Sequence, residues 1–174
     1  MKLDINSYIK SKAKIISNLP YYVSTQILIK MLPLNKNISE VVFTFQKEVG
    51  DRIIARPGSK NYSRLSIIVQ SVCHVTVLQK LPASVFYPKP SVDSVILKFT
   101  ARKKININNF ERLKMITKEA FSKRRKKIKN SLKNIESISN LLLEINIDEN
   151  IRPEDISVDL YCKLTNLISE KIIK

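Results

Sequence analysis

One short turn constrains the fold of this chain more than any other feature. An apolar run, Lys14-Ile15-Ile16-Ser17, is typical of a β-strand and stops at Asn18-Leu19-Pro20-Tyr21. A helical pattern follows over residues 23–32. A strand that breaks at a proline-containing turn and leads into a helix predicts an α/β fold with the turn at the carboxyl end of the strand. Open α/β sheets bind their ligands at such ends.

The side chains of this turn suit methylation of an adenine amine. That amine is a poor nucleophile, because its lone pair is delocalised into the ring. Acceptors on both amino hydrogens would pull the nitrogen toward tetrahedral geometry, and the Asn18 side chain and the Leu19 carbonyl, held extended by Pro20, can supply them. Tyr21 offers a flat face for an extruded base. The same four residues also fit an ordinary strand-to-helix turn with a core tyrosine.

The charge of the chain points to a polyanionic partner. The formal net charge is +16 in 174 residues, which predicts binding to nucleic acid or to an acidic membrane surface. Residues 1–102 hold 15 Lys and Arg against 5 Asp and Glu, and residues 103–174 hold 16 against 10. Both parts are therefore basic. No segment approaches the roughly 18 apolar residues of a membrane span, and no signal-peptide pattern is present, so we expect a cytoplasmic protein.

The rare residue types limit cofactor and metal chemistry. Only Gly50 and Gly58 are glycines, and neither belongs to a Gly-rich turn of the kind that a nucleotide-type cofactor normally needs. Cys73 and Cys162 lie far apart without further ligands nearby, which favours reduced thiols over a disulfide or a metal site. His74, the only histidine, is more typical of a strand residue than of a catalytic base.

The hydrophobic patterns divide the chain into two domains. Over residues 1–102 the patterns predict a mixed α/β domain, with strands at 13–17, 40–46, 75–81 and 94–99 and helices at 23–32, 47–55 and 62–72. After a boundary near residues 101–106 only helical patterns remain, at 110–121, 123–132, 138–145 and 158–173. Residues 103–174 are therefore predicted to form a small all-helical domain.

Five motifs together carry a family resemblance. They are NLPY at 18–21, QKEV at 46–49, RPGSKNYSRLS at 56–66, FYPKPSVDS at 86–94 and AFSKRRKKIKNSL at 120–132. In this combination, nearly the whole chain from about Lys14 onward closely resembles the bacterial small-subunit ribosomal RNA adenine N6-dimethyltransferases. The resemblance implies the C-terminal half of a Rossmann-like, S-adenosylmethionine-dependent methyltransferase sheet, followed by a helical RNA-binding domain.

The resemblance also implies an enzymatic activity and its residues. Enzymes of this family dimethylate two adjacent adenines in a hairpin loop of small-subunit rRNA, so the expected partner is that rRNA or the pre-30S subunit. The implied catalytic residues are Asn18, Leu19, Pro20, Tyr21 and Phe86. Asn18 and the Leu19 carbonyl would hold the amine, and Tyr21 and Phe86 would stack on the flipped base. Asn18 would also border the cofactor S-adenosylmethionine. No metal and no membrane are expected.

A separate set of cations is expected to grip the RNA backbone. Five consecutive cations, Lys123, Arg124, Arg125, Lys126 and Lys127, are predicted to open a helix, and no acidic run follows them in the sequence. Such a run is often only a solvated face, but the absence of neutralising acids favours a phosphate partner. The full set of expected RNA contacts is Arg52, Lys60, Arg64, Lys89, Lys123, Arg124, Arg125, Lys126, Lys127 and Lys129.

Some family features have no counterpart in this sequence. The family's first strand, its Gly-rich loop and the acidic cofactor ligands would precede residue 1, and Ser17 stands where the family commonly has Gly. Without the neighbouring strand, the strand at 14–18 would be left with an unpaired edge. We therefore expect poor solubility or partial disorder at residues 1–20 of the isolated chain, relieved by a separately encoded N-terminal half if one exists.

Two alternatives remain open from the sequence. The related large-subunit rRNA methyltransferases that confer macrolide resistance share a similar tetrapeptide, although the motifs at 46–49 and 120–132 favour the small-subunit branch. The chain is also compatible with a non-catalytic RNA-binding or ribosome-assembly module, whose enzymatic role would have been lost with the cofactor half.

Overall fold

The computed structural model describes residues 9–123 and 125–172, and it divides into two compact units. The first unit comprises the chain up to Ile54 together with Val72–Lys103, and the second comprises Ala55–Ser71 together with the chain from Lys104 onward. The hydrophobic patterns predict that residues 55–71 belong to the α/β part, whereas in the structure they belong to the second unit.

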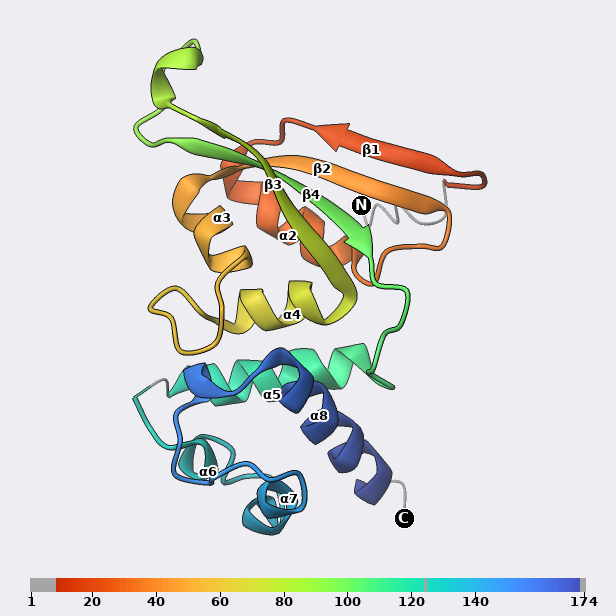
Figure 1. The fold of residues 1–174 in the computed structure, drawn as a ribbon, viewed down its shortest axis with the longest axis vertical. Helices are drawn as coiled ribbons and strands as arrows, with labels where there is room; N and C mark the ends of the chain where they lie inside the picture. Colours follow the sequence, from red (N-terminus) through yellow and green to blue (C-terminus); the bar gives the residue numbers. More distant parts are fainter. Residues whose placement is uncertain (1–8, 124, 173–174) are drawn as a thin grey trace. The chain divides into compact units, whose positions relative to one another are not determined.

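A four-stranded mixed sheet forms the centre of the first unit (Figure 1). The strands are β1 (Ala13–Ser17), β2 (Ile38–Gln46), β3 (Cys73–Leu81) and β4 (Ser94–Ala101), in the order β1-β2-β4-β3. β1 runs parallel to β2, and β4 is antiparallel to both β2 and β3. The four predicted strands are confirmed. In the described sheet β1 is an edge strand, and its Ile16 is 74% exposed.

Two helices pack against the sheet of the first unit. These are α2 (Tyr21–Met31) and α3 (Lys47–Ile53), and both are predicted from the sequence. Leu28 and Met31 are the buried apolar residues of α2. Within the sheet, Phe45 meets Phe99 edge-on with the ring centroids 5.9 Å apart. In the register of these strands, every second pair joins a buried residue of β2 to a buried residue of β4, for example Phe45 to Val95. These pairs form a continuous apolar layer.

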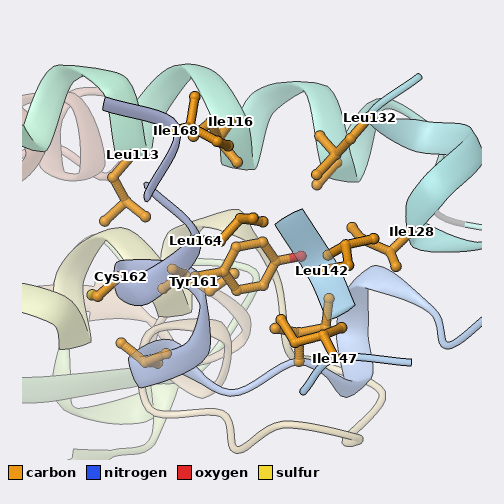
Figure 2. Close-up of a cluster of buried hydrophobic side chains, with 14 of the residues drawn as sticks. Leu113, Ile116, Ile128, Leu132, Leu142, Ile147, Tyr161, Cys162, Leu164 and Ile168 are labelled. Carbon is orange, nitrogen blue, oxygen red and sulfur yellow. The ribbon is translucent and has the colours of Figure 1, made fainter. Parts of the chain in front are cut away.

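The second unit is all-helical (Figure 1). Its elements are α4 (Arg64–Val72, of which Val72 belongs to the first unit), α5 (Phe110–Ser122), α6 (Ile128–Ser131), α7 (Ile138–Glu144), the 3-10 turn η2 (Pro153–Asp155) and α8 (Val158–Ile172). Figure 2 shows its core, in which side chains of α5, α6, α7 and α8 converge around Tyr161. The hydroxyl of Tyr161 donates to the Pro153 carbonyl at 3.0 Å, and that of Tyr62 donates to the Ile156 carbonyl at 3.0 Å. These bonds satisfy the two buried phenols.

The prediction of a helix over residues 123–132 is wrong. α5 ends at Ser122 with Lys123 as its C-cap, and among the described residues of this range that follow it only Ile128–Ser131 are helical, with Lys127 as the N-cap. A continuous helix would place like charges at positions 123 and 127, and again at 125 and 129, and such pairs destabilise helices. The turn separates these charges and still allows Ile128 and Leu132 to be buried. We refer to residues 123–127 as the cationic turn.

The structure bears on the N-terminal segment and on the question of membrane-spanning helices. Residues 1–8, part of the segment for which partial disorder was predicted, lie outside the described residues, while Ala13–Ser17 form β1. In the part of the chain that the structure describes, no helix is both long and apolar enough to cross a membrane.

Substitution of Gly50 by alanine is predicted to destabilise the first unit. A Cβ atom at Gly50 would lie 2.1 Å from Cγ1 of Val95, a buried and β-branched side chain that has little freedom to move. Alanine gains about 1 kcal/mol in helix propensity, but overpacking of this kind costs about 1–3 kcal/mol. We expect a net loss in the free energy of unfolding, measured by urea denaturation and circular dichroism.

A double variant provides the control for this prediction. Val95→Ala removes the obstructing Cγ1, so Gly50→Ala/Val95→Ala should lose less stability than the two single losses added together. Additive losses would show that the helix and the strand do not meet at this point.

Candidate active site and nucleic-acid interface

Three of the sequence motifs meet at one end of the sheet, where the parallel strands β1 and β2 finish. β1 ends at Ser17, which pairs with Phe43, and β2 continues in the same direction to Gln46. The first residue of β4, Ser94, pairs with both Gln46 and Leu81. The turn after β1, the end of β2 and the connection from β3 to β4 therefore lie at the same end of the sheet, as expected for a ligand site in an α/β sheet.

The turn after β1 is fixed by the start of α2. Pro20 is the N-cap, with φ −55° and ψ 134°, and its carbonyl accepts from the N–H groups of Val23 and Ser24 at 3.1 and 3.2 Å. The hydroxyl of Ser24, which is buried, donates to the Tyr21 carbonyl at 2.9 Å. Tyr21 is thus the first helical residue, and its side chain projects from a well-defined backbone.

A cavity of about 280 Å³ lies at this end of the sheet. It is lined by Asn18, Leu19, Pro20, Tyr21 and Phe86. Asn18 is exposed, whereas the rings of Tyr21 and Phe86 are half-buried. The volume is at the small end of the usual range for ligand pockets, which suits a single flat base. The structure thus brings all five residues of the expected catalytic set together.

Two residues without an assigned role in the sequence analysis support the walls of this cavity. The Ser94 hydroxyl lies 2.6 Å from the Tyr21 hydroxyl, and Ser94 is 1% exposed. Asp93 Oδ1 accepts from the Ala83 N–H at 3.0 Å. Ala83 begins the 3-10 turn η1 (Ala83–Val85), and Phe86 follows it directly. No local sequence signal pairs residue 21 with residue 94.

The motif at 46–49 lines a second cavity in the same unit, of about 440 Å³. Its lining residues are Gln46, Lys47, Glu48, Asp51, Ser91, Val92 and Asp93. Lys47 Nζ donates to Asp51 Oδ2 at 2.9 Å, and this hydrogen bond raises the pKa of Lys47. The Lys47 ammonium therefore already has a carboxylate partner within the unit.

The expected RNA contacts outside the cationic turn occupy different environments in the two units. In the first unit, Arg52 pairs with Glu48 and Lys89 is exposed in the β3–β4 connection. In the second unit, Lys60 is exposed, while Arg64 begins α4 and is half-buried, its Nε enclosed without a hydrogen-bond partner. Of these four residues, Arg52, Lys60 and Lys89 are exposed to solvent, whereas Arg64 is not.

The described side chains of the cationic turn are exposed. Lys123, Arg125, Lys126 and Lys127 are exposed, and Arg124 lies outside the described residues. The loop after α7 approaches the far end, where Lys127 Nζ donates to Asn150 Oδ1 at 2.9 Å.

Lys129, which follows the turn, is also paired with this loop. Its Nζ lies 2.5 Å from Glu149 Oε1, and this hydrogen bond is the main cause that lowers the pKa of Glu149. Tertiary structure therefore supplies an acid that the local sequence does not show. The exposed positive charge of the turn itself, at Lys123, Arg125, Lys126 and Lys127, is left without such an acid among the contacts of the described residues.

The described residues offer no metal centre. Within residues 9–123 and 125–172, no three His, Cys, Asp or Glu side chains lie close enough together to hold an ion.

This chain is similar to known ribosomal RNA methyltransferases. The family model of ribosomal RNA adenine dimethylase matches residues 1–170. Ribosomal RNA small subunit methyltransferase A of Ehrlichia chaffeensis is 36% identical over 171 residues, covering 97% of this chain and 65% of that protein. A dimethyladenosine transferase from Plasmodium falciparum superposes with a TM-score of 0.80 at 25% identity, over 94% of this chain and 70% of that one. The 23S rRNA methyltransferase ErmE has a TM-score of 0.65 at 16% identity, over 93% and 69% of the two chains, and shows a shared fold.

The fold and the matches define the class and the family. The sheet with its flanking helices is that of a Rossmann-like methyltransferase, which confirms the predicted fold class. The chain belongs to the ribosomal RNA adenine dimethylase family, as the motifs indicated. It spans 65% of the length of the Ehrlichia chaffeensis relative.

The two cysteines are predicted to be unreactive in the folded protein. Cys73 is 1% exposed and Cys162 is 3% exposed. Burial raises the pKa of the Cys73 thiol to about 12, so almost no thiolate is present at pH 8. We expect a colorimetric disulfide reagent such as DTNB to label neither residue at pH 8 in the native chain, and to label both at once in urea. Rapid labelling of the native chain would contradict the buried placement.

Proposed function

We propose that this chain serves in the S-adenosylmethionine-dependent dimethylation of the N6 amines of two adjacent adenines in a small-subunit rRNA hairpin loop. The main support is the single cavity that gathers Asn18, Leu19, Pro20 and Tyr21 with Phe86 from a distant segment of the chain. Membership of the family supports the same reaction. The substrate would be the rRNA itself or the pre-30S subunit, which places the protein in the cytoplasm.

The cavity suits the binding and alignment of a flipped adenine. Tyr21 and Phe86 offer aromatic faces, and stacking on such faces is how unstacked RNA bases are usually held. The Asn18 side chain offers a carbonyl acceptor for one amino hydrogen, and the Leu19 backbone carbonyl offers a second. Two acceptors draw the nitrogen toward tetrahedral geometry and aim its lone pair out of the ring plane.

This reaction needs no strong base at the cavity. Once its nitrogen is alkylated, the amine loses a proton readily to water. The five residues that line the cavity include no carboxylate, histidine or lysine. Their contribution is therefore positional and electrostatic, through fixed acceptors and rings rather than through a titrating group.

The described residues contribute a small part of a cofactor site. S-adenosylmethionine, when bound, supplies an electrophilic methyl group. Asn18 is the residue that would border it, because it lies at the carboxyl end of β1 and already lines the base cavity. A cavity of about 280 Å³ suits the base but not a base together with the whole cofactor.

Cations of both units would bind the RNA backbone, and most of them belong to the second unit. We propose that residues 1–102 act as the target-adenine part of the catalytic domain and residues 103–174 as the RNA-binding domain. The exposed cations of the cationic turn, with Lys60 and Lys89, would contact phosphates, which position an RNA without reading its sequence. Arg52, Arg64 and Lys129 also belong to this proposed contact set.

Substitution of Asn18 by alanine is predicted to abolish methylation and to spare RNA binding. Removal of one positioned polar group from such a site typically lowers the rate by about 100-fold or more. Asn18 is neutral, so the phosphate contacts are unaffected. Methyl transfer from radiolabelled S-adenosylmethionine to an rRNA hairpin measures the first effect, and fluorescence anisotropy measures the second.

A matched variant and a binding measurement complete this test. Asn140→Ala changes an exposed asparagine of α7 and should leave both quantities unchanged. Retained activity of Asn18→Ala would refute the proposed role of this residue. If calorimetry detects RNA binding but no S-adenosylmethionine binding, both by the wild-type chain alone and after addition of any N-terminal half encoded upstream, the chain is an RNA-binding module rather than an enzyme.

Neutralising two arginines of the cationic turn is predicted to flatten the salt dependence of RNA binding. Arg124→Gln/Arg125→Gln should weaken binding and reduce the slope of log K against log salt by about 1.5, because each lost phosphate contact removes about 0.7–0.9. The control is Lys118→Gln, at an exposed position of α5. An unchanged slope in the double variant would place the RNA backbone elsewhere.

A further inference from the structure

Ser94 connects the central part of the sheet to one wall of the base cavity. It is the first residue of β4 and pairs with Gln46 on one side and Leu81 on the other. It is 1% exposed, and its Oγ lies 2.6 Å from the Tyr21 hydroxyl. This distance is within the range of a good O–H···O hydrogen bond, in which either group can donate.

Asp93 connects the same point of the sheet to the segment that carries the second aromatic lining residue, Phe86. Its backbone carbonyl accepts from the Lys47 N–H at 2.9 Å, which joins it to the start of α3. Its Oδ1 accepts from the Ala83 N–H at 3.0 Å, and the Phe86 N–H in turn donates to the Ala83 carbonyl at 3.3 Å. The backbone of Phe86 is thus two hydrogen bonds away from the Asp93 carboxylate.

Two adjacent residues therefore fix both aromatic walls. Tyr21 begins a helix and Phe86 follows a 3-10 turn, so nothing in their own segments sets the distance between the rings. β4 is hydrogen-bonded along both edges and provides a rigid common reference. A base held between two rings needs them about 7 Å apart, twice the usual contact distance of roughly 3.5 Å.

We infer that Asp93 and Ser94 are positioning residues that set the width of the base cavity, Ser94 through Tyr21 and Asp93 through Phe86. This inference rests on the proposed function and adds to it the residues that preorganise the base site. Neither residue touches the base. Their effect is on how firmly an extruded adenine is held with its amine in line, because displacements of about 1 Å in such sites lower rates strongly.

The test uses the whole chain and two RNA hairpins. One hairpin carries the fluorescent base 2-aminopurine in place of a target adenine and reports how the flipped base is held. The other carries adenine and reports methyl transfer. For Ser94→Ala we expect RNA affinity within twofold of wild type, a 2-aminopurine response reduced by at least half, and a kcat about tenfold lower with KM for RNA unchanged.

Two further variants separate positioning from simple damage to the fold. Tyr21→Phe removes the same hydrogen bond from the other side, so Ser94→Ala/Tyr21→Phe should be no worse than the more affected of the two single variants. Asp93→Asn keeps an acceptor oxygen for Ala83 and should resemble wild type, whereas Asp93→Ala should lower the 2-aminopurine response. If Ser94→Ala does not fold, Tyr21→Phe carries the test, since it keeps the ring.

The control is Ser91→Ala, an exposed serine of the same loop, which should behave as wild type. A wild-type 2-aminopurine response and kcat in Ser94→Ala would overturn the inference while leaving the proposed function intact. A wild-type chain that binds neither hairpin gives a different result, because it overturns the proposed function and this inference with it.

Discussion

The pairing of β4 with an antiparallel neighbour on each side is the constraint on which the rest of the site depends. A strand bonded along both edges cannot shift its register without breaking two ladders, so its first residue has one fixed place. That residue is Ser94, and it lies at the end of the sheet where the turn after β1 and the β3–β4 connection meet. The Tyr21 hydroxyl is hydrogen-bonded to Ser94, and the start of η1 is hydrogen-bonded to the preceding residue, Asp93. The geometry of the cavity therefore originates in the sheet and not in the loops that line it.

The packing under the sheet strengthens the same point. Gly50 lets α3 approach β4 so closely that any larger residue would meet Val95, the neighbour of Ser94. The first residue of that helix, Lys47, donates its N–H to the Asp93 carbonyl. On the same layer, Phe45 is opposite Val95 in the register and packs against Phe99. A close helix contact and a backbone hydrogen bond thus hold the start of β4, and an aromatic pair holds the strand further along, at Phe99.

The sequence predicts the elements of this fold well and their long-range contacts poorly. Runs of β-branched and aromatic residues locate the four strands, and the motifs name all five residues that the cavity brings together. The hydrogen bond between Tyr21 and Ser94 is not predictable in this way, since the residues are 73 positions apart and a serine at the start of a strand has no distinctive pattern. The helix wrongly predicted over 123–132 has a local cause, because like charges four residues apart oppose it. The limit on long-range contacts explains the unforeseen pairing of Lys129 with Glu149. Propensity is local, whereas these outcomes depend on which charges and rings the fold brings together.

The two proposed tasks of the chain use forces of different range. The cavity is lined by neutral groups, so its grip on a base depends on contacts of a few ångströms and on hydrogen bonds that salt screens little. The cationic turn acts through charge, and at physiological ionic strength such attraction fades beyond about 8 Å. Salt should therefore change how much RNA is bound, while the rate at saturating RNA should follow the geometry of the cavity. This separation arises because the acceptors and rings at the sheet edge carry no net charge, and because part of the charge next to the turn, at Lys129, is already neutralised within the fold.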